Sequence, residues 1–111
     1  EISCSLVGSE MCIRDRYLSA ADRMNPEVAA YYKSDSTAML RLLGFVFREF
    51  SKREKEISVC GEMAGNPETA QLLVGLGARK LSMSSGNIAG VKAKLAECTL
   101  QELTALAEKK L

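Results

Sequence analysis

Two short apolar runs, each followed by a turn and an amphipathic helix, constrain the fold of this chain most. Residues 57–60 read Ile-Ser-Val-Cys, and residues 79–83 read Arg-Lys-Leu-Ser-Met. Short apolar runs that alternate with amphipathic helices are typical of parallel strands in an α/β fold. Because a parallel sheet is normally covered by helices on both faces, two strands predict only part of a larger α/β domain.

Helix-start and helix-stop signals divide the rest of the chain. Asn-Pro occurs at residues 25–26 and again at 66–67, with asparagine suited to the cap and proline to the first helical position. Gly61 and Gly65 are expected to break the chain into a loop, and Gly77 to end a helix. The expected helices cover residues 26–31, 36–53, 67 to just before 77, from 84 or 85 onward, and 99–110, the last opened by a capping box of Thr99 and Glu102.

Composition excludes several functional classes. The net charge is +1 and Trp is absent, so neither nucleic acid nor an anionic membrane is expected as a partner. Histidine is absent, which removes the commonest general base and the commonest neutral metal ligand. No apolar run approaches the roughly 20 residues that span a bilayer. The spacings of the four cysteines match no zinc pattern. We expect reduced thiols and a cytoplasmic protein.

The first 16 residues stand apart from the rest. They read EISCSLVGSEMCIRDR, a string that resembles a translated sequencing adapter and lacks the long apolar core of a signal peptide. An ordinary strand and turn at residues 2–8 is the alternative. We expect residues 1–16 to be non-native and take the functional argument from residues 17–111.

Two motifs resemble the phosphoenolpyruvate-utilising enzymes. Residues 57–88, ISVCGEMAGNPETAQLLVGLGARKLSMSSGNI, are similar to the last barrel motif of that family, and residues 17–25, YLSAADRMN, resemble the stretch after its sixth barrel strand. The resemblance implies the C-terminal portion of a (β/α)8 TIM barrel, incomplete on its own. Met63-Ala64-Gly65 and Leu81-Ser82-Met83-Ser84 are most similar to the phosphoenolpyruvate–protein phosphotransferases, enzyme I of the bacterial sugar phosphotransferase system. Pyruvate phosphate dikinase and phosphoenolpyruvate synthase are the alternatives within the family.

The resemblance also implies an activity and partners for a longer parent protein. These are phosphoryl transfer from phosphoenolpyruvate to a protein histidine with release of pyruvate, Mg²⁺ as cofactor, a histidine phosphocarrier protein as partner, and a homodimer. The 111-residue chain is expected to be inactive alone. An alternative from another functional class is that the chain is a small non-catalytic α/β interaction module.

Four residues carry the expected site. By resemblance Cys60 is the proton donor to the methylene carbon of the enolate of pyruvate, and Arg23 binds the substrate through a planar guanidinium suited to phosphate or carboxylate. Gly61 and Glu62 follow Cys60 and are carried as possible supporting residues. From composition alone, Cys60 would be a buried structural thiol and Arg23 a solvated arginine paired with Asp22.

One departure from the family pattern limits the metal site. The family carries an Asn-Asp pair before the position of Tyr17, and its aspartate binds magnesium. Here Ile13-Arg14-Asp15-Arg16 occupies that place, and Asp15 is not at the matching offset. We therefore assign no metal ligand to this chain.

Overall fold

The computed structural model describes residues 25–31 and 35–111. The chain divides into two compact units, Glu1–Met39 and Leu40–Leu111. Residues 1–24, which include Arg23 and the adapter-like string, lie outside the described residues. The fold that follows is that of the second unit, apart from the short helix before it.

The first Asn-Pro signal opens a 3₁₀ helix, η2 (Pro26–Tyr31). The Asn25 side-chain oxygen accepts a hydrogen bond from the Glu27 backbone N–H at 3.0 Å. The Val28 N–H binds the Asn25 carbonyl at 3.3 Å, which is the three-residue spacing of a 3₁₀ turn. The predicted start and end of this helix are confirmed. The sequence did not predict that it is a 3₁₀ helix.

The long helix α2 (Thr37–Lys52) matches the range predicted for residues 36–53. Its first turn is capped by Ser36, whose hydroxyl accepts from the Met39 N–H at 3.4 Å. On the second unit's part of α2, Leu40 and Phe47 are buried, whereas Phe45 is 55% exposed. The three- and four-residue spacing of apolar residues from Met39 to Phe50 predicts the face that includes Phe47, and Leu40 is buried in addition to that face.

Two parallel strands form the sheet. Strand β1 (Ser58–Cys60) pairs with β2 (Lys80–Ser82) in the register Ser58↔Lys80, Val59↔Leu81 and Cys60↔Ser82. The strands were predicted as buried, but only the middle residue of β1 is buried, and both end residues of β2 are exposed. The sheet described has two strands, so in the part of the chain that the structure describes each strand has an outer edge that pairs with no further strand.

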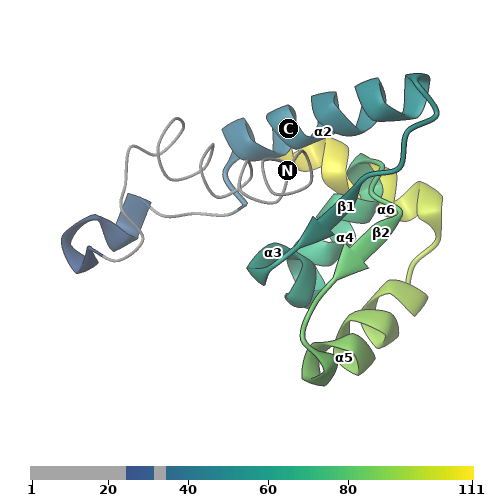
Figure 1. Ribbon diagram of the computed structural model, residues 1–111. Helices are drawn as coiled ribbons and strands as arrows, with labels where there is room; N and C mark the ends of the chain where they lie inside the picture. The colour runs from purple at the N-terminus through teal and green to yellow at the C-terminus, as the bar shows by residue number, and fades with distance from the viewer. Residues whose placement is uncertain (1–24, 32–34) are drawn as a thin grey trace. The chain divides into compact units, whose positions relative to one another are not determined.

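Four helices accompany the strands (Figure 1). They are α3 (Glu62–Gly65), α4 (Pro67–Leu76), α5 (Ser85–Ala96) and α6 (Leu100–Lys110). Helices α3 and α4 connect β1 to β2, and α4 contacts both α5 and α6. The predicted loop at residues 61–65 is wrong in one respect: between its two glycines the chain makes the single helical turn α3.

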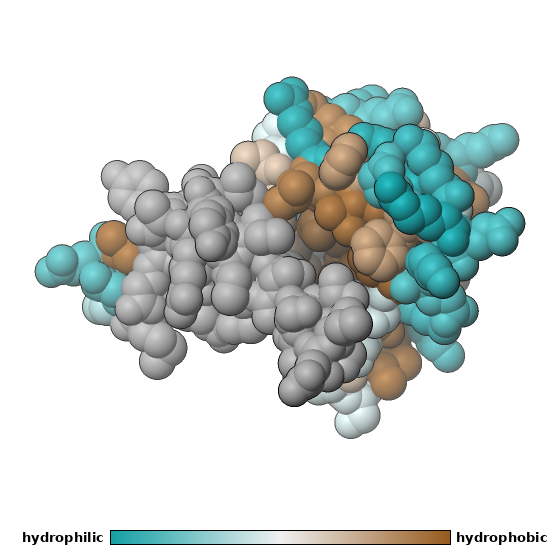
Figure 2. All heavy atoms as spheres, turned by 45° about the horizontal axis from the view of Figure 1, so that its top comes forward, coloured by the Kyte–Doolittle hydropathy of each residue, from teal (hydrophilic) through white to brown (hydrophobic). Residues whose placement is uncertain are grey.

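The core gathers around α4. Leu73 is fully buried and Leu72 nearly so. The Arg41 side chain of α2 donates a hydrogen bond to the Leu111 carbonyl oxygen, with its Nε at 2.9 Å. The buried cluster comprises Leu40, Phe47, Val59, Met63, Ala64, Leu72, Leu73 and Ala78. Figure 2 shows hydrophobic surface on one face of the unit beside hydrophilic residues. Among the described residues, no helix is both long and apolar enough to cross a membrane.

Candidate functional site

Cys60 ends strand β1, at the carboxyl edge of the two-stranded sheet. Its neighbour Val59 is buried in the core, while Cys60 itself is half-buried and carries a free thiol. Side chains alternate between faces along a strand, so burial of Val59 turns Cys60 toward the opposite face. The thiol is therefore held by a packed strand and remains accessible, which is the combination an acid–base group requires.

Gly61 makes the chain leave the strand abruptly. Its backbone has φ +94° and ψ −155°, a conformation that is essentially restricted to glycine. A Cβ at this position would meet nothing within 4 Å, so the restriction comes from the backbone and not from crowding. Because Gly61 turns the chain at once, Cys60 is the last residue of β1 and lies at the carboxyl edge of the sheet.

Glu62 opens the helical turn α3 and is exposed. The next two residues, Met63 and Ala64, are fully buried. The turn therefore has a solvent-facing start and an anchored second half. Cys60, Gly61 and Glu62 are consecutive in the chain, and the structure shows no contact between the Glu62 carboxyl and the thiol.

The carboxyl edge also carries residues that the sequence reasoning missed. Ser82 lies directly opposite Cys60 in the strand register. Asn87, in the first turn of α5, lies so close to α3 that a Cβ at Gly65 would be 2.6 Å from its side-chain nitrogen. Ser82 and Asn87 were visible in the sequence, but only the strand pairing places Ser82 opposite Cys60, and only the packing of α5 places Asn87 beside Gly65.

Helix α4 is fixed at both ends. The Asn66 side-chain oxygen accepts from the backbone N–H groups of Glu68 at 2.9 Å and Thr69 at 3.2 Å. At the other end Gly77 adopts a left-handed conformation with φ +119°. Both signals were predicted from the sequence. They make α4 the rigid body that connects the Cys60 turn to the second strand.

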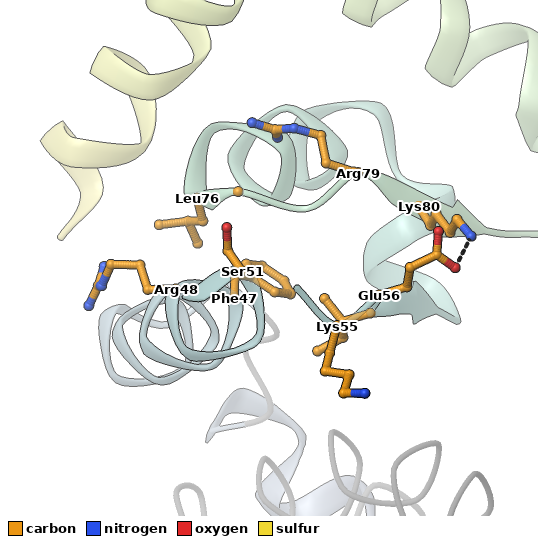
Figure 3. Close-up of a pocket in the computed structure, with 10 residues that line it drawn as sticks. Phe47, Arg48, Ser51, Lys55, Glu56, Leu76, Arg79 and Lys80 are labelled. Atoms are coloured by element: carbon orange, nitrogen blue, oxygen red, sulfur yellow. Dashed lines mark hydrogen bonds and ion pairs between the residues drawn. The ribbon is translucent and has the colours of Figure 1, made fainter. Parts of the chain in front are cut away.

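A pocket of about 350 Å³ lies at the opposite, amino end of the two strands (Figure 3). Its charged groups do not converge. Arg79 donates to the carbonyl oxygens of Ala78 at 2.8 Å and Val74 at 3.2 Å, and Lys80 is paired with Glu56 at 2.5 Å. Figure 3 shows the charged ends of Arg48 and Lys55 pointing in different directions. We therefore centre the candidate site on Cys60.

No metal cluster forms in the part of the chain that the structure describes. There, no three His, Cys, Asp or Glu side chains lie close enough together to hold a metal ion. Glu62 is a single carboxylate at the carboxyl edge. The described residues therefore do not form a magnesium site by themselves.

Comparison with known proteins relates this site to a family. The family model described as "PEP-utilising enzyme, PEP-binding domain" matches residues 15–100. The chain is 40% identical over 96 residues to the "Phosphoenolpyruvate-dependent phosphotransferase system" protein of Salmonella typhimurium, and 42% identical over 96 residues to the "Multiphosphoryl transfer protein" of Xanthomonas campestris. It is 36% identical over 94 residues to the "Phosphoenolpyruvate-protein phosphotransferase" of Bacillus subtilis.

These alignments cover most of this chain and little of the relatives. They include 86%, 86% and 85% of the chain, but 13%, 12% and 16% of the three relatives. The matched range contains both strands and the turn that presents Cys60. On this basis the chain belongs to the family of phosphoenolpyruvate-utilising enzymes.

Proposed function

We propose that this chain is the C-terminal part of a phosphoenolpyruvate–protein phosphotransferase. The observation that carries the proposal is a free, half-buried thiol at the carboxyl end of a parallel strand, directly before a glycine in a glycine-only conformation. In barrel enzymes that end of the strands holds the active site. Because the chain spans only 12% to 16% of the three relatives compared above, the activity belongs to a longer parent protein.

Cys60 is the acid–base group in this proposal. Cleavage of the bond between phosphorus and the enol oxygen leaves the enolate of pyruvate, and the phosphoryl group passes to a histidine nitrogen. The thiol then gives its proton to C3: a carbon–hydrogen bond forms, the sulfur–hydrogen bond breaks, and the sulfur keeps the electron pair as thiolate. The chain has no histidine, so the phosphoryl acceptor lies elsewhere in the parent protein or in its partner.

The parent domain is proposed to be a (β/α)8 barrel. Two features of the second unit support this. The described sheet has only two strands, both parallel. An apolar groove of about 470 Å³ beside β2, lined in part by Leu81, Val91 and Leu95, leaves hydrophobic surface uncovered. In a closed barrel, further strands and helices would cover both.

Substrate binding is proposed to involve Arg23, which lies outside the described residues. A bidentate guanidinium contact to phosphate or carboxylate cannot be reproduced by lysine. In the parent protein, Arg23→Lys is expected to lower kcat/KM by more than an exposed ion pair explains, since such a pair contributes about 0–1 kcal/mol. Unchanged kcat/KM for phosphoenolpyruvate would remove Arg23 from the site.

The remaining components belong to the parent protein. Mg²⁺ would bridge substrate phosphate and carboxylates contributed from outside the described residues. A histidine phosphocarrier protein would receive the phosphoryl group, and the parent would act as a cytoplasmic homodimer. Transfer to a nucleotide, as in pyruvate phosphate dikinase, is not favoured, because the relatives matched here are named as phosphotransferase or phosphoryl transfer proteins. A free-standing interaction module is not favoured for the same reason.

Residues 1–16 are proposed to be non-native. The adapter-like string SLVGSEMCIRDR supports this, and the family match leaves residues 1–14 outside, although it includes residues 15 and 16. Amplification of the locus from source DNA should give a different sequence before Tyr17, with the Asn-Asp pair of the family. Recovery of SLVGSEMCIRDR from genomic template would refute the proposal.

The experiment that tests the function compares two cysteines in the full-length protein that carries this segment. Cys60→Ala removes the proposed acid, while Cys98→Ala removes the other described free thiol, which lies between α5 and α6. The measured quantity is exchange of the methyl protons of pyruvate with deuterated solvent. A positioned acid–base group typically contributes about 10²–10⁴-fold, so Cys60→Ala should lose most of the exchange.

Phosphoryl transfer provides the second readout. It should persist in Cys60→Ala at a reduced rate, because water can protonate the released enolate. Cys98→Ala should match the parent protein in both assays. If methyl-proton exchange in Cys60→Ala stays within a few-fold of that in Cys98→Ala, Cys60 is a packing residue and the site assignment is wrong.

A further inference from the structure

The turn after Cys60 contains a buried carbonyl group that the turn itself leaves without a partner. Within the turn, the Gly65 N–H binds the Gly61 carbonyl and the Asn66 N–H binds the Glu62 carbonyl, each at 3.1 Å. The chain then leaves the helix, so the carbonyl of Met63 receives no continuing backbone bond of this kind. Met63 is only 1% exposed, and a buried carbonyl without a hydrogen bond is costly.

Thr69 supplies the missing donor from the next helix. Its hydroxyl lies 2.5 Å from the Met63 carbonyl oxygen and 3.2 Å from that of Asn66. A threonine hydroxyl has a single proton to donate, and the shorter distance assigns that proton to Met63. One hydrogen bond thus connects the turn after Cys60 to the first turn of α4.

Helix α4 is a rigid support for this bond. The four residues that follow Thr69, from Ala70 to Leu73, are all buried, and the helix is capped by Asn66 and by Gly77. On the strand side, by contrast, Gly61 has no side chain to restrict its rotation. The hydrogen bond from Thr69 to the Met63 carbonyl therefore fixes the turn at the end away from Gly61.

We propose that Thr69 is a positioning residue for Cys60, an inference that rests on the proposed function of that thiol. The Thr69 hydroxyl bonds to backbone carbonyls and not to the thiol. It holds the Met63 carbonyl, and through that carbonyl the turn α3, which follows Cys60 and Gly61 in the chain. Acid–base geometry is sensitive to such support, because a misplacement of about 1 Å can reduce a rate by roughly 10²-fold.

The test uses variants that differ in the hydroxyl. Thr69→Val replaces the hydroxyl by a methyl group of similar size, Thr69→Ala removes it with the γ-methyl group, and Thr69→Ser keeps it. The matched control is Thr104→Val in α6, which removes a similar hydroxyl-to-carbonyl bond of 2.9 Å to Leu100, on an exposed turn of another helix. All variants are made in the full-length protein and assayed with Cys60→Ala alongside.

The expected result is a loss in turnover and not in binding. Thr69→Val and Thr69→Ala should lower kcat for methyl-proton exchange of pyruvate by about 10–100-fold, with KM changed little, because the thiol is misplaced while phosphate and carboxylate contacts remain. Thr69→Ser should restore most of kcat. Thr104→Val should leave both constants unchanged.

Each failure has a separate meaning. If Cys60→Ala keeps its exchange activity, the proposed function of Cys60 fails, and the inference about Thr69 falls with it. If Cys60→Ala loses exchange while both hydroxyl-free variants keep the kcat of Thr104→Val, only the Thr69 inference is overturned. If Thr69→Ser fails to restore kcat, the residue acts through packing of its methyl group, and the positioning hydrogen bond is refuted.

Discussion

Gly61 is the residue whose backbone does most to expose the Cys60 thiol. Its φ of +94° and ψ of −155° lie in a region that other residues avoid. A side chain there would find open space, so substitution tests the backbone alone. The conformation carries the chain from the end of β1 into α3 within one residue, and the thiol is left at the edge.

Gly61→Ala should therefore destabilise the turn by about 1–3 kcal/mol, the usual cost of forcing a residue with a side chain into such a conformation. Hydrogen exchange of the Gly65 amide reports this directly, because that amide binds the Gly61 carbonyl. Its protection should fall in the variant, while amides in the middle of α4 keep theirs. Unchanged protection at Gly65 would show that the turn tolerates alanine.

At the scale of elements, helices α4 and α6 cross at a glycine. A Cβ at Gly75 would lie 2.7 Å from the carbonyl carbon of Leu103 and 2.9 Å from the Cβ of Ala107. Backbone cannot move aside as a side chain can, so the two helices approach this closely only with glycine at the crossing. Leu103 and Ala107 are buried by the contact.

Gly75→Ala should push α6 away from α4 and lower the free energy of unfolding by about 1–3 kcal/mol, the usual cost of overpacking. The matched control is Gly86→Ala in α5, where an added Cβ meets nothing within 4 Å. Alanine favours a helix by up to about 1 kcal/mol over glycine, so the control should be neutral or stabilising. Denaturant unfolding of the two variants measures the difference. Equal denaturant midpoints for the two variants would show that the crossing of α4 and α6 does not require glycine at residue 75.

The start of α6 depends on pH through its capping box. The Thr99 N–H donates to the Glu102 carboxylate at 2.7 Å and the Thr99 hydroxyl does so at 2.9 Å, which lowers the pKa of Glu102 below its ordinary value of 4.5. A carboxyl with a lowered pKa stabilises the fold above the unfolded pKa, and this contribution disappears as the pH falls through the folded pKa.

Hydrogen exchange at the start of α6 should therefore accelerate as the pH is lowered below about 4.5, after correction for the intrinsic pH dependence of exchange. The Leu103 amide, which binds the Thr99 carbonyl at 3.0 Å, is the probe. Glu102→Gln should remove the pH-dependent part. A pH dependence that persists in Glu102→Gln would assign it to another group.

Local signals predicted the elements well because they act within a few residues. Asn66 at the cap, Gly77 in the left-handed conformation and the Thr99–Glu102 box were each predicted from neighbouring residues and confirmed. The strand pairing of Cys60 with Ser82 joins residues far apart in sequence, and no local pattern gives its register. The Thr69 bond to Met63 spans only six residues, but it depends on how α3 and α4 meet, which no capping signal predicts. The turn α3 was missed because Gly61 and Gly65 predicted a loop, although the buried residues Met63 and Ala64 lie between them.

At the scale of the whole molecule, phosphoryl transfer to histidine needs an acceptor histidine and a bound magnesium ion in addition to the proposed thiol. The chain has no histidine to accept a phosphoryl group, and its described residues hold no metal cluster. The purified 111-residue chain should therefore release no pyruvate from phosphoenolpyruvate in the presence of Mg²⁺. A coupled lactate dehydrogenase assay measures pyruvate, with full-length protein as positive control. Pyruvate formed at a rate proportional to the amount of chain would refute the expectation.

The strand register has a consequence for how the length of the chain before β1 can change. Val59 faces the core and Cys60 the other side, and the two would exchange sides if the strand slid by one residue against Leu81 and Ser82. A slide of two residues would restore the side but carry the thiol about 7 Å along the strand. Insertions and deletions between α2 and β1 are therefore harmless only when the connection absorbs them before Ser58. Among relatives of this chain, variation in length should collect at residues 53–56, and the distance in sequence from Val59 to Gly61 should stay constant.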